Sequence, residues 1–332
     1  MSATYKDIQR LTGFSLSTIS RHFNGEKVRP TTSIAIKEAA EQLNFKINDF
    51  ARGLKSGKAM SVGLLIPNLN SVFCTTITYE VGRYLRQQGY GCFVCDYSSD
   101  KHNRLDAINF LIKKSVDGII IVPSDDSPAQ LELARNWGVP TVLIDNTVPS
   151  IETDAVVIDN FNAGKMAANH FLEKGHENVA IISGRTWLPT MNDRQRGFLS
   201  QFTESGHSAH LIETFFSIEE GYKAARKLLT EPSEITAVFC TNYELTMGVV
   251  TAMNELGIRF PVDISLIGFD NMELTRIIKP AITLVEQPID QIAYCAADLL
   301  LTRFEGEAAR PYETIVLAAK LFEGDSVADL RG

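Results

Sequence analysis

The sequence predicts an α/β protein, in which a small all-α head precedes a larger body of parallel sheets flanked by helices. Short β-branched runs alternate with helical stretches from residue 61 onward, which is typical of parallel sheets. The first sixty residues lack such runs and show three short helical patterns separated by turn residues. At 332 residues the chain is longer than one hydrophobic core usually supports, so we expect more than one lobe.

The first predicted helix opens at a capping box. Thr4 is followed three residues later by Asp7, and the helix that they begin is expected to bury Ile8 and Leu11. Gly13 then supplies a tight turn.

Two further helices complete the head. Ser15 can cap a second helix that runs through Phe23, and Asn24-Gly25 ends it. A third helix after Pro30 buries Ile36, Ala39, Ala40 and Leu43 and closes on Phe45. Three short helices with a glycine turn predict a helix-turn-helix over residues 1–46.

The second helix carries a surface suited to DNA. Its N-terminal residues would lie at base edges in the major groove. Leu16, Ser17 and Arg21 would read sequence there, with Arg21 donating to guanine and Leu16 contacting a thymine methyl. The residues suited to phosphate oxygens are Thr18, Ser20 and Asn24. The alternative is a three-helix interaction module whose surface hydroxyl groups have no role in binding DNA.

Charge is divided unevenly along the chain. The formal net charge is −8, yet residues 1–58 carry ten Lys and Arg against five Asp and Glu. The remaining residues carry 22 basic against 35 acidic side chains. A basic head on an acidic body indicates an anionic partner for the head alone.

Residues 47–60 form a predicted hinge. Gly53, Ser56 and Gly57 disfavour a stable isolated helix in this segment. From the residues alone it is a flexible linker.

The body contains eight predicted buried strands: SVGLLIP, YGCFVCDY, DGIIIVP, PTVLIDN, DAVVIDN, NVAIISG, TAVFC and DISLIGFD. They fall into two successive blocks, about 61–159 and 160–288, which predict two similar lobes. We expect the final segment, 289–332, to return to the first lobe. A cleft between the lobes is the natural ligand site.

Polar residues follow several of these strands. Asp145, Asp159, Asn242 and Asp270 come at carboxyl ends, where open α/β sheets bind ligands, and Arg194 is expected to open a helix after the SGRTW loop. Each of these residues could serve only as a strand-end cap. As a set, however, their polar groups suit the hydroxyl groups of a polyol ligand.

Motifs for catalysis are absent from the sequence. It contains no G-x-G-x-x-G, Walker loop, G-x-S-x-G or H-E-x-x-H, so no enzyme activity, cofactor or metal is expected. His207 and His210 lie in a loop-like ESGHSAH stretch. Five scattered cysteines, no signal peptide and no membrane-length apolar run predict a cytoplasmic protein with reduced thiols.

The head resembles that of the lactose-repressor (LacI/GalR) family of bacterial transcription regulators. The family pattern D-V-A-x-x-A-G-V-S-x-x-T-V-S-R-x-L-N-G is in register with Asp7-Ile8, Gly13-Phe14-Ser15, Thr18-Ile19-Ser20-Arg21 and Asn24-Gly25. Gln9, Thr12 and Ile47 depart from the pattern. Ser33 replaces a customary arginine, and Arg29 could restore that charge at the phosphates.

The resemblance implies a role for the hinge on DNA. In this family the hinge becomes a helix when two chains sit side by side on the operator. Leu54 would then wedge into the minor groove, with Ala51 and Lys55 as further DNA-binding positions.

The resemblance also implies a two-lobed, periplasmic-binding-protein-like effector domain. Arg194 matches the family's R-x-x-G-F run, while Asn242 and Asp270 match its T-N-D and G-F-D runs. These three, with Asp145, would bind hydroxyl groups of an effector, and Phe73 and Phe216 would either pack on its apolar face or belong to the core. Tyr243 and Ser71-Val72 depart from the family pattern.

These inferences lead to a functional hypothesis. We expect a homodimeric transcription regulator, a repressor, that binds a palindromic double-stranded DNA operator and is switched by a small molecule. A sugar or sugar acid is favoured over a purine-like effector. The alternatives are a sugar-type solute-binding protein without a DNA role and a cytoplasmic sugar enzyme.

Overall fold

A computed structural model describes residues 3–23, 26–45, 58–97, 101–123, 127–185, 188–270, 277–304 and 310–331. The chain forms two compact units, Met1–Met60 and Ser61–Gly332. Most of the predicted hinge lies outside the described residues.

The first unit is helical where it is described. It contains α1 (Tyr5–Thr12), α2 (Leu16–Phe23) and α3 (Pro30–Gln42). Thr4 and Asp7 form the predicted capping box, and Gly13 ends α1 with φ 72°. The bounds of α1 and α2 confirm the sequence-based expectation. Helix α3 begins at Pro30 as expected but ends at Gln42, and Leu43, expected to be buried, is its half-buried C-cap.

One isoleucine from each helix forms the centre of the head. Ile8, Ile19 and Ile36 are fully buried and are surrounded by half-buried aromatic rings. Tyr5 stacks on Phe23 with ring centroids 5.4 Å apart. The expected burial of Leu11 is wrong, because the two-turn α1 buries only Ile8 and leaves Leu11 48% exposed.

The second unit contains two six-stranded sheets among its described residues. The first sheet has the order β11-β5-β4-β3-β1-β2, and its neighbours are parallel. Its strands are β1 (Ser61–Ile66), β2 (Gly91–Asp96), β3 (Gly118–Ile121), β4 (Thr141–Ile144), β5 (Asp154–Ile158) and β11 (Thr314–Leu317).

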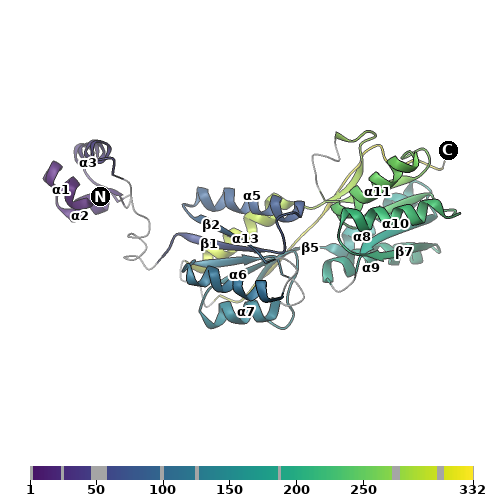
Figure 1. Ribbon diagram of the computed structural model, residues 1–332, viewed down its shortest axis with the longest axis horizontal. Helices are drawn as coiled ribbons and strands as arrows, with labels where there is room; N and C mark the ends of the chain where they lie inside the picture. Colours follow the sequence, from purple (N-terminus) through teal and green to yellow (C-terminus); the bar gives the residue numbers. More distant parts are fainter. Residues whose placement is uncertain are drawn as a thin grey trace. The chain divides into compact units, whose positions relative to one another are not determined.

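Helices cover both faces of the first sheet. They are α5 (Val72–Gln87), α6 (Lys101–Lys113), α7 (Ser127–Asn136) and α13 (Ile289–Phe304). Helix α13 packs against α5, and α6 packs against α7 on the other side of the sheet (Figure 1). We call this sheet with its helices lobe 1.

The second sheet repeats the arrangement in the order β12-β10-β9-β8-β6-β7. Its strands are β6 (Asn178–Gly184), β7 (Ser208–Thr214), β8 (Ala237–Cys240), β9 (Ser265–Phe269), β10 (Thr283–Glu286) and β12 (Lys320–Phe322). Helix α8 (Asn160–Glu173) pairs with α9 (Pro189–Glu204), and α10 (Ile218–Thr230) pairs with α11 (Tyr243–Leu256). This is lobe 2.

The end of the chain differs from the expectation. Helix α13 and β11 do return to the first sheet, but β12 pairs antiparallel with β10 in the second. The segment 289–332 is therefore shared between the lobes. The short runs of β10, β11 and β12 were not predicted as strands.

Two sequence interpretations of the body are wrong. YGCFVCDY was predicted as a buried strand, but β2 lies at the sheet edge and leaves Phe93 36% and Val94 39% exposed. ESGHSAH was interpreted as a loop, but β7 begins at Ser208 and includes His210. Strand β7 pairs with β6 over seven positions, a partnership that the local sequence does not reveal.

Candidate DNA-binding and effector sites

A cluster of hydroxyl groups lies at the N-terminus of α2. The Ser15 hydroxyl oxygen accepts from the Thr18 amide at 3.3 Å and lies 2.8 Å from the Ser17 hydroxyl. Ser15 thus acts as the predicted cap. Leu16 and Ser17 are exposed at the first turn, on a helix whose buried residue is Ile19.

Arg21 extends into solvent from the last turn of α2. Its side chain is 64% exposed, and Nε lies 3.5 Å from Oε2 of Glu26. The Glu26 amide also donates to the Arg21 carbonyl at 3.0 Å. An exposed ion pair of this length contributes little to stability, so the guanidinium is free to exchange Glu26 for another acceptor.

The start of α3 includes its N-cap residue Arg29 and also Ser33, two positions that the sequence analysis considered for phosphate contacts. Arg29 is exposed immediately before Pro30, the first residue of the helix. Ser33, which stands where the family usually has arginine, forms a 3.1 Å hydrogen bond with Nδ1 of His22. Ser33 therefore joins α3 to α2.

The remaining DNA-binding candidates are only partly described. Thr18 and Ser20 are half-buried on α2. Asn24, Ala51, Leu54 and Lys55 lie outside the described residues.

Arg194 is the central cation of the second candidate site. It lies within α9, which begins five residues earlier than the sequence suggested, and the residue is only 2% exposed. Nε donates to Asn160 Oδ1 and Nη1 donates to the Thr241 carbonyl, both at 2.7 Å. Its guanidinium carbon lies 3.6 Å from the centre of the Phe269 ring. These contacts fix the plane of the guanidinium.

Asp145 and Asp270 occupy equivalent positions in the two lobes. Asp145 follows β4 and Asp270 follows β9, and both have φ 75°. The Asp145 amide donates to Val156 of β5 at 3.0 Å, and the Asp270 amide donates to Val285 of β10 at 2.9 Å. The same backbone turn therefore presents a carboxylate at the end of the matching strand in each repeat.

The two carboxylates and Arg194 act on one another. Burial raises the pKa of Asp145 to about 6, with a further rise from Asp270 and a partial offset from Arg194. Burial also lowers the pKa of Arg194, against the opposite effect of Asp270 and Asp145, although a guanidinium stays protonated. The electrostatic coupling joins a residue of lobe 1 to two residues of lobe 2.

Asn242 and Asp270 are held by neighbours that the sequence did not identify. Asn242 caps α11 by accepting from the Leu245 amide at 3.1 Å. Asp270 accepts from Gln287 Nε2 and from the Tyr243 amide, the latter at 3.4 Å. Both candidates therefore have structural duties that fix their orientation.

The two aromatic candidates lie in different lobes. Phe73 stands in the first turn of α5 and is half-buried. Phe216 is half-buried against Gly184, where a β-carbon would come within 1.8 Å of its ring. Gly184 is thus required for the Phe216 ring to lie over the end of β6.

Several buried polar residues of this region were missed. Asn160 accepts from Arg194, and Asn146 Oδ1 accepts from the Thr190 amide of the other lobe at 3.3 Å. Thr190 Oγ1 and Gln195 Oε1 are buried without a hydrogen-bond partner among the described residues. Asn146 and Asn160 each follow a strand-end aspartate, which is the one local sequence signal that these residues carried.

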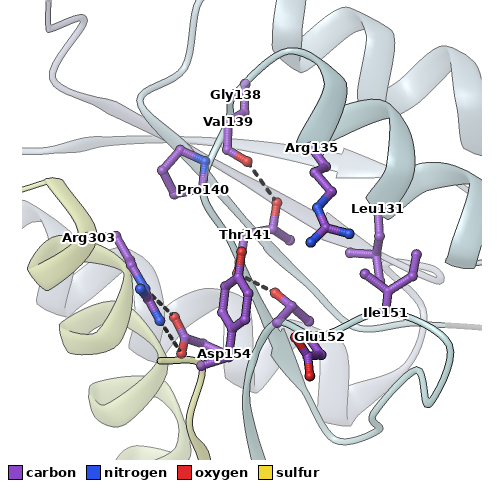
Figure 2. A pocket seen from close by; sticks show the side chains of 12 residues that line it. Leu131, Arg135, Gly138, Val139, Pro140, Thr141, Ile151, Glu152, Asp154 and Arg303 are labelled. Atoms are coloured by element: carbon purple, nitrogen blue, oxygen red, sulfur yellow. Dashed lines mark hydrogen bonds and ion pairs between the residues drawn. The ribbon is translucent and has the colours of Figure 1, made fainter. Parts of the chain in front are cut away.

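A cavity of about 200 Å³ lies elsewhere in lobe 1 and includes none of the predicted site residues. Figure 2 shows Arg303 of α13 reaching Asp154 at the start of β5. The two side chains form a buried ion pair, with Nε–Oδ2 2.8 Å and Nη2–Oδ1 3.0 Å. Arg303 also donates to the carbonyls of Arg310 and Pro311, so this pair holds the incoming end of β11.

Comparison with known proteins identifies the relatives of the chain. Residues 168–327 match the periplasmic binding protein-like domain. A protein of Glaesserella parasuis named HTH-type transcriptional repressor PurR is 32% identical over 317 residues, which cover 94% of this chain and 93% of the relative. This chain belongs to the LacI/GalR family of transcription regulators.

Solved structures agree with this assignment at the level of the fold. A lac repressor dimer bound to operator and an anti-inducer is 22% identical, has a TM-score of 0.86 and matches 99% of this chain and 100% of its own. A complex of the transcriptional regulator CelR with cellobiose is 25% identical, with a TM-score of 0.74, and matches 98% of this chain and 99% of its own.

Membership of the LacI/GalR family assigns general roles to the two units. The protein is a DNA-binding transcriptional repressor with an effector-binding domain. Within the described parts of this LacI/GalR chain, no helix has the length and apolar character needed to cross a bilayer. The same residues contain no cluster of three His, Cys, Asp or Glu suited to a metal.

Proposed function

We propose that this repressor binds a palindromic operator as a homodimer through its paired α2 helices. The exposed Arg21, at the end of a helix capped by Ser15, is the observation that supports sequence-specific recognition. Leu16 and Ser17 would contact base edges beside it, and Thr18, Ser20 and Arg29 would contact phosphates. Asn24, Ala51, Leu54 and Lys55 remain proposals from the sequence alone.

We further propose that a small polar molecule binds between the lobes and changes operator affinity. The group of Arg194, Asp270 and the half-buried Asp145 supports this proposal, because its members come from both lobes and offer an oriented guanidinium and two carboxylates. Asn242, Phe73 and Phe216 complete the proposed site. A sugar or sugar acid suits these groups, and cellobiose is the ligand in the solved complex of CelR.

The first experiment identifies the operator. Purified protein is used to select duplexes from a random library, and we expect an inverted repeat whose bound species contains two chains. Selection of non-palindromic sequences by a single chain would refute the proposed dimeric recognition.

The second experiment tests the effector site with a matched pair of arginines on α9. Thermal shifts are measured with a panel of sugars, sugar acids and purines, and the ligand that stabilises wild type is then added to operator complexes. Arg194→Ala should lose the ligand response, whereas Arg196→Ala, which removes an exposed partner of Asp193, should keep it. If Arg194→Ala, but not Arg196→Ala, lost operator binding and ligand response equally, Arg194 would not act specifically at the effector site.

A further inference from the structure

Glu244 occupies a position where the two lobes meet. It is the second residue of α11 in lobe 2 and is half-buried. One carboxylate oxygen, Oε2, accepts from Nδ2 of Asn242 at 2.7 Å. The carboxylate also interacts with its own backbone amide. On these contacts alone, Glu244 would belong to the N-terminus of α11.

The second carboxylate oxygen reaches the other lobe. Oε1 accepts from the Ser71 hydroxyl at 3.3 Å, and the nearby Val72 amide lowers the pKa of the Glu244 carboxyl. Ser71 is the N-cap of α5 and Val72 is its first helical residue. Glu244 therefore contacts the first residues of a lobe 1 helix from the start of a lobe 2 helix.

Helix α5 has no side-chain cap of its own. Ser71 stands at the cap position but makes no capping hydrogen bond with the helix, and the first turn of α5 contains no acidic residue. The first amides of a helix need acceptors, and the positive end of its dipole favours an anion. Glu244 brings a negative charge to this end of α5 from outside lobe 1 and accepts from the hydroxyl of its N-cap residue, Ser71.

The setting of Glu244 opposes ionisation unless these donors are present. Burial raises the pKa of Glu244, and the nearby Asp270 adds to the rise, while the amides and Ser71 lower it. Burial likewise raises the pKa of Cys74, in the same turn of α5, to about 12, with a smaller contribution from the charge of Glu244. Removing a partner while the carboxylate stays buried is therefore costly.

We propose that Glu244 is an interlobe capping residue that holds the N-terminus of α5, and with it Phe73, against lobe 2. Separation of the lobes then removes the negative charge from the start of α5 and leaves the Glu244 carboxylate with Asn242 and water as partners. Glu244 thereby favours the arrangement of the lobes in which Phe73 lies near the effector site. The effect of Glu244 on the ligand response rests on the proposed effector site, whereas its capping of α5 does not.

Hydrogen exchange in the full-length protein tests the cap directly. Peptides covering residues 67–76 and 241–248 report on the two helix starts separately. In Glu244→Gln and Glu244→Ala we expect exchange to rise in both peptides, by about twofold to fivefold for the loss of one helix-terminal charge. Ser71→Ala should raise exchange in the 67–76 peptide to a smaller extent, because the charge of Glu244 stays at the start of α5. Glu234→Gln, a change at an exposed glutamate of lobe 2, is the matched control and should change neither peptide.

The two peptides also define the result that would overturn the proposal. A rise confined to residues 241–248 would show that Glu244 caps α11 alone. If Glu244→Ala fails to fold, Glu244→Gln and Ser71→Ala decide between these outcomes. Glu244→Gln keeps the side-chain volume of the glutamate, and Ser71→Ala removes only one hydroxyl group. The measurement needs neither operator nor effector, so its failure leaves the proposed repressor function to its own tests.

Discussion

Two arginines in this protein show how burial decides what a guanidinium can do. Arg21 is 64% exposed and has one weak carboxylate partner, so most of its five donors face solvent. Arg194 is 2% exposed, and its donors are engaged by Asn160 and by the Thr241 carbonyl. The first arginine can exchange partners on meeting DNA, whereas the second is oriented before any ligand arrives.

Replacing Arg21 tests its proposed role at the base edges. Arg21→Ala should reduce discrimination between the selected operator and random duplex by about 1–3 kcal/mol, because a bidentate guanine contact is lost. Fluorescence anisotropy titrations with both duplexes measure the ratio. Arg29→Ala is the control and should weaken both complexes alike, as expected for a phosphate contact. A uniform loss in Arg21→Ala would place Arg21 on the phosphates instead.

At the scale of elements, local sequence signals were sufficient to predict the helices of the head and the central strands of the body. Caps such as Thr4 and Ser15 and the turn at Gly13 lie next to the helices that they limit, and the bounds of α1 and α2 agree with the sequence. Strands β7, β10, β11 and β12 were not predicted. Their runs are short or partly exposed, and only pairing with distant strands defines them.

Close helix contact depends on two glycines. A β-carbon on Gly197 of α9 would lie 1.9 Å from the Phe161 carbonyl oxygen, and one on Gly164 of α8 would lie 2.0 Å from the Arg194 carbonyl oxygen. Both obstacles are main-chain atoms, so the helices would have to separate. These glycines therefore fix the position of the helix that carries Arg194.

An alanine at Gly197 should be destabilising. We expect Gly197→Ala to lower the free energy of unfolding by about 1–3 kcal/mol through overpacking, as measured by urea denaturation. Gly82→Ala is the matched control within α5, because its nearest obstacle is the flexible end of Arg86 at 3.3 Å. That control should be neutral or slightly stabilising, since alanine favours helix. Equal behaviour of the two variants would contradict the role of close packing.

The C-terminal segment packs onto a buried histidine. His176 is 1% exposed, and its ring bonds to the Thr236 hydroxyl at 2.8 Å and to the Ala328 carbonyl at 3.1 Å. Burial lowers the pKa of His176 below its ordinary value of 6.5, in spite of the Ala328 contact. The unfolded chain therefore binds a proton at a higher pH than the folded chain does.

Stability should consequently fall on acidification. The contribution of His176 is fully present above pH 6.5 and is lost as the pH falls through 6.5 toward the lowered value of the folded state. Urea denaturation at pH 7.5 and at pH 5.5 measures the difference. His176→Asn should reduce this pH dependence, while His210→Asn, at an exposed position of β7, should not. An unchanged dependence in His176→Asn would exclude this histidine as the cause.

At the scale of the whole molecule, the two lobes repeat one plan, and the proposed effector site contains one aspartate from the same position in each lobe. The sequence indicated Asp145 and Asp270 because each directly follows a strand. It could not indicate Gln287 or Glu244, because their roles depend on partners from other parts of the chain. Strand ends can be predicted locally, whereas the contacts that orient their side chains require the assembled fold.

The uneven charge of the chain predicts a strong effect of salt on operator binding. If a dimer neutralises about eight phosphates, the logarithm of affinity should fall with the logarithm of salt concentration at a slope of about −7. Titrations of operator binding between roughly 50 and 200 mM salt measure this slope. Lys55→Ala should make the slope shallower if that lysine contacts phosphate. A flat response would contradict electrostatic docking of the basic head.

The chain passes from one lobe to the other after β5, after β10 and after β11. Consequently neither half can be produced from one uninterrupted piece of the gene. A polypeptide stopped near residue 288 would lack α13 and the edge strand β11, and with them the Arg303 partner of Asp154. Screens for shortened or split versions of this repressor should therefore recover breaks in surface loops, and not removal of the last 44 residues, 289–332.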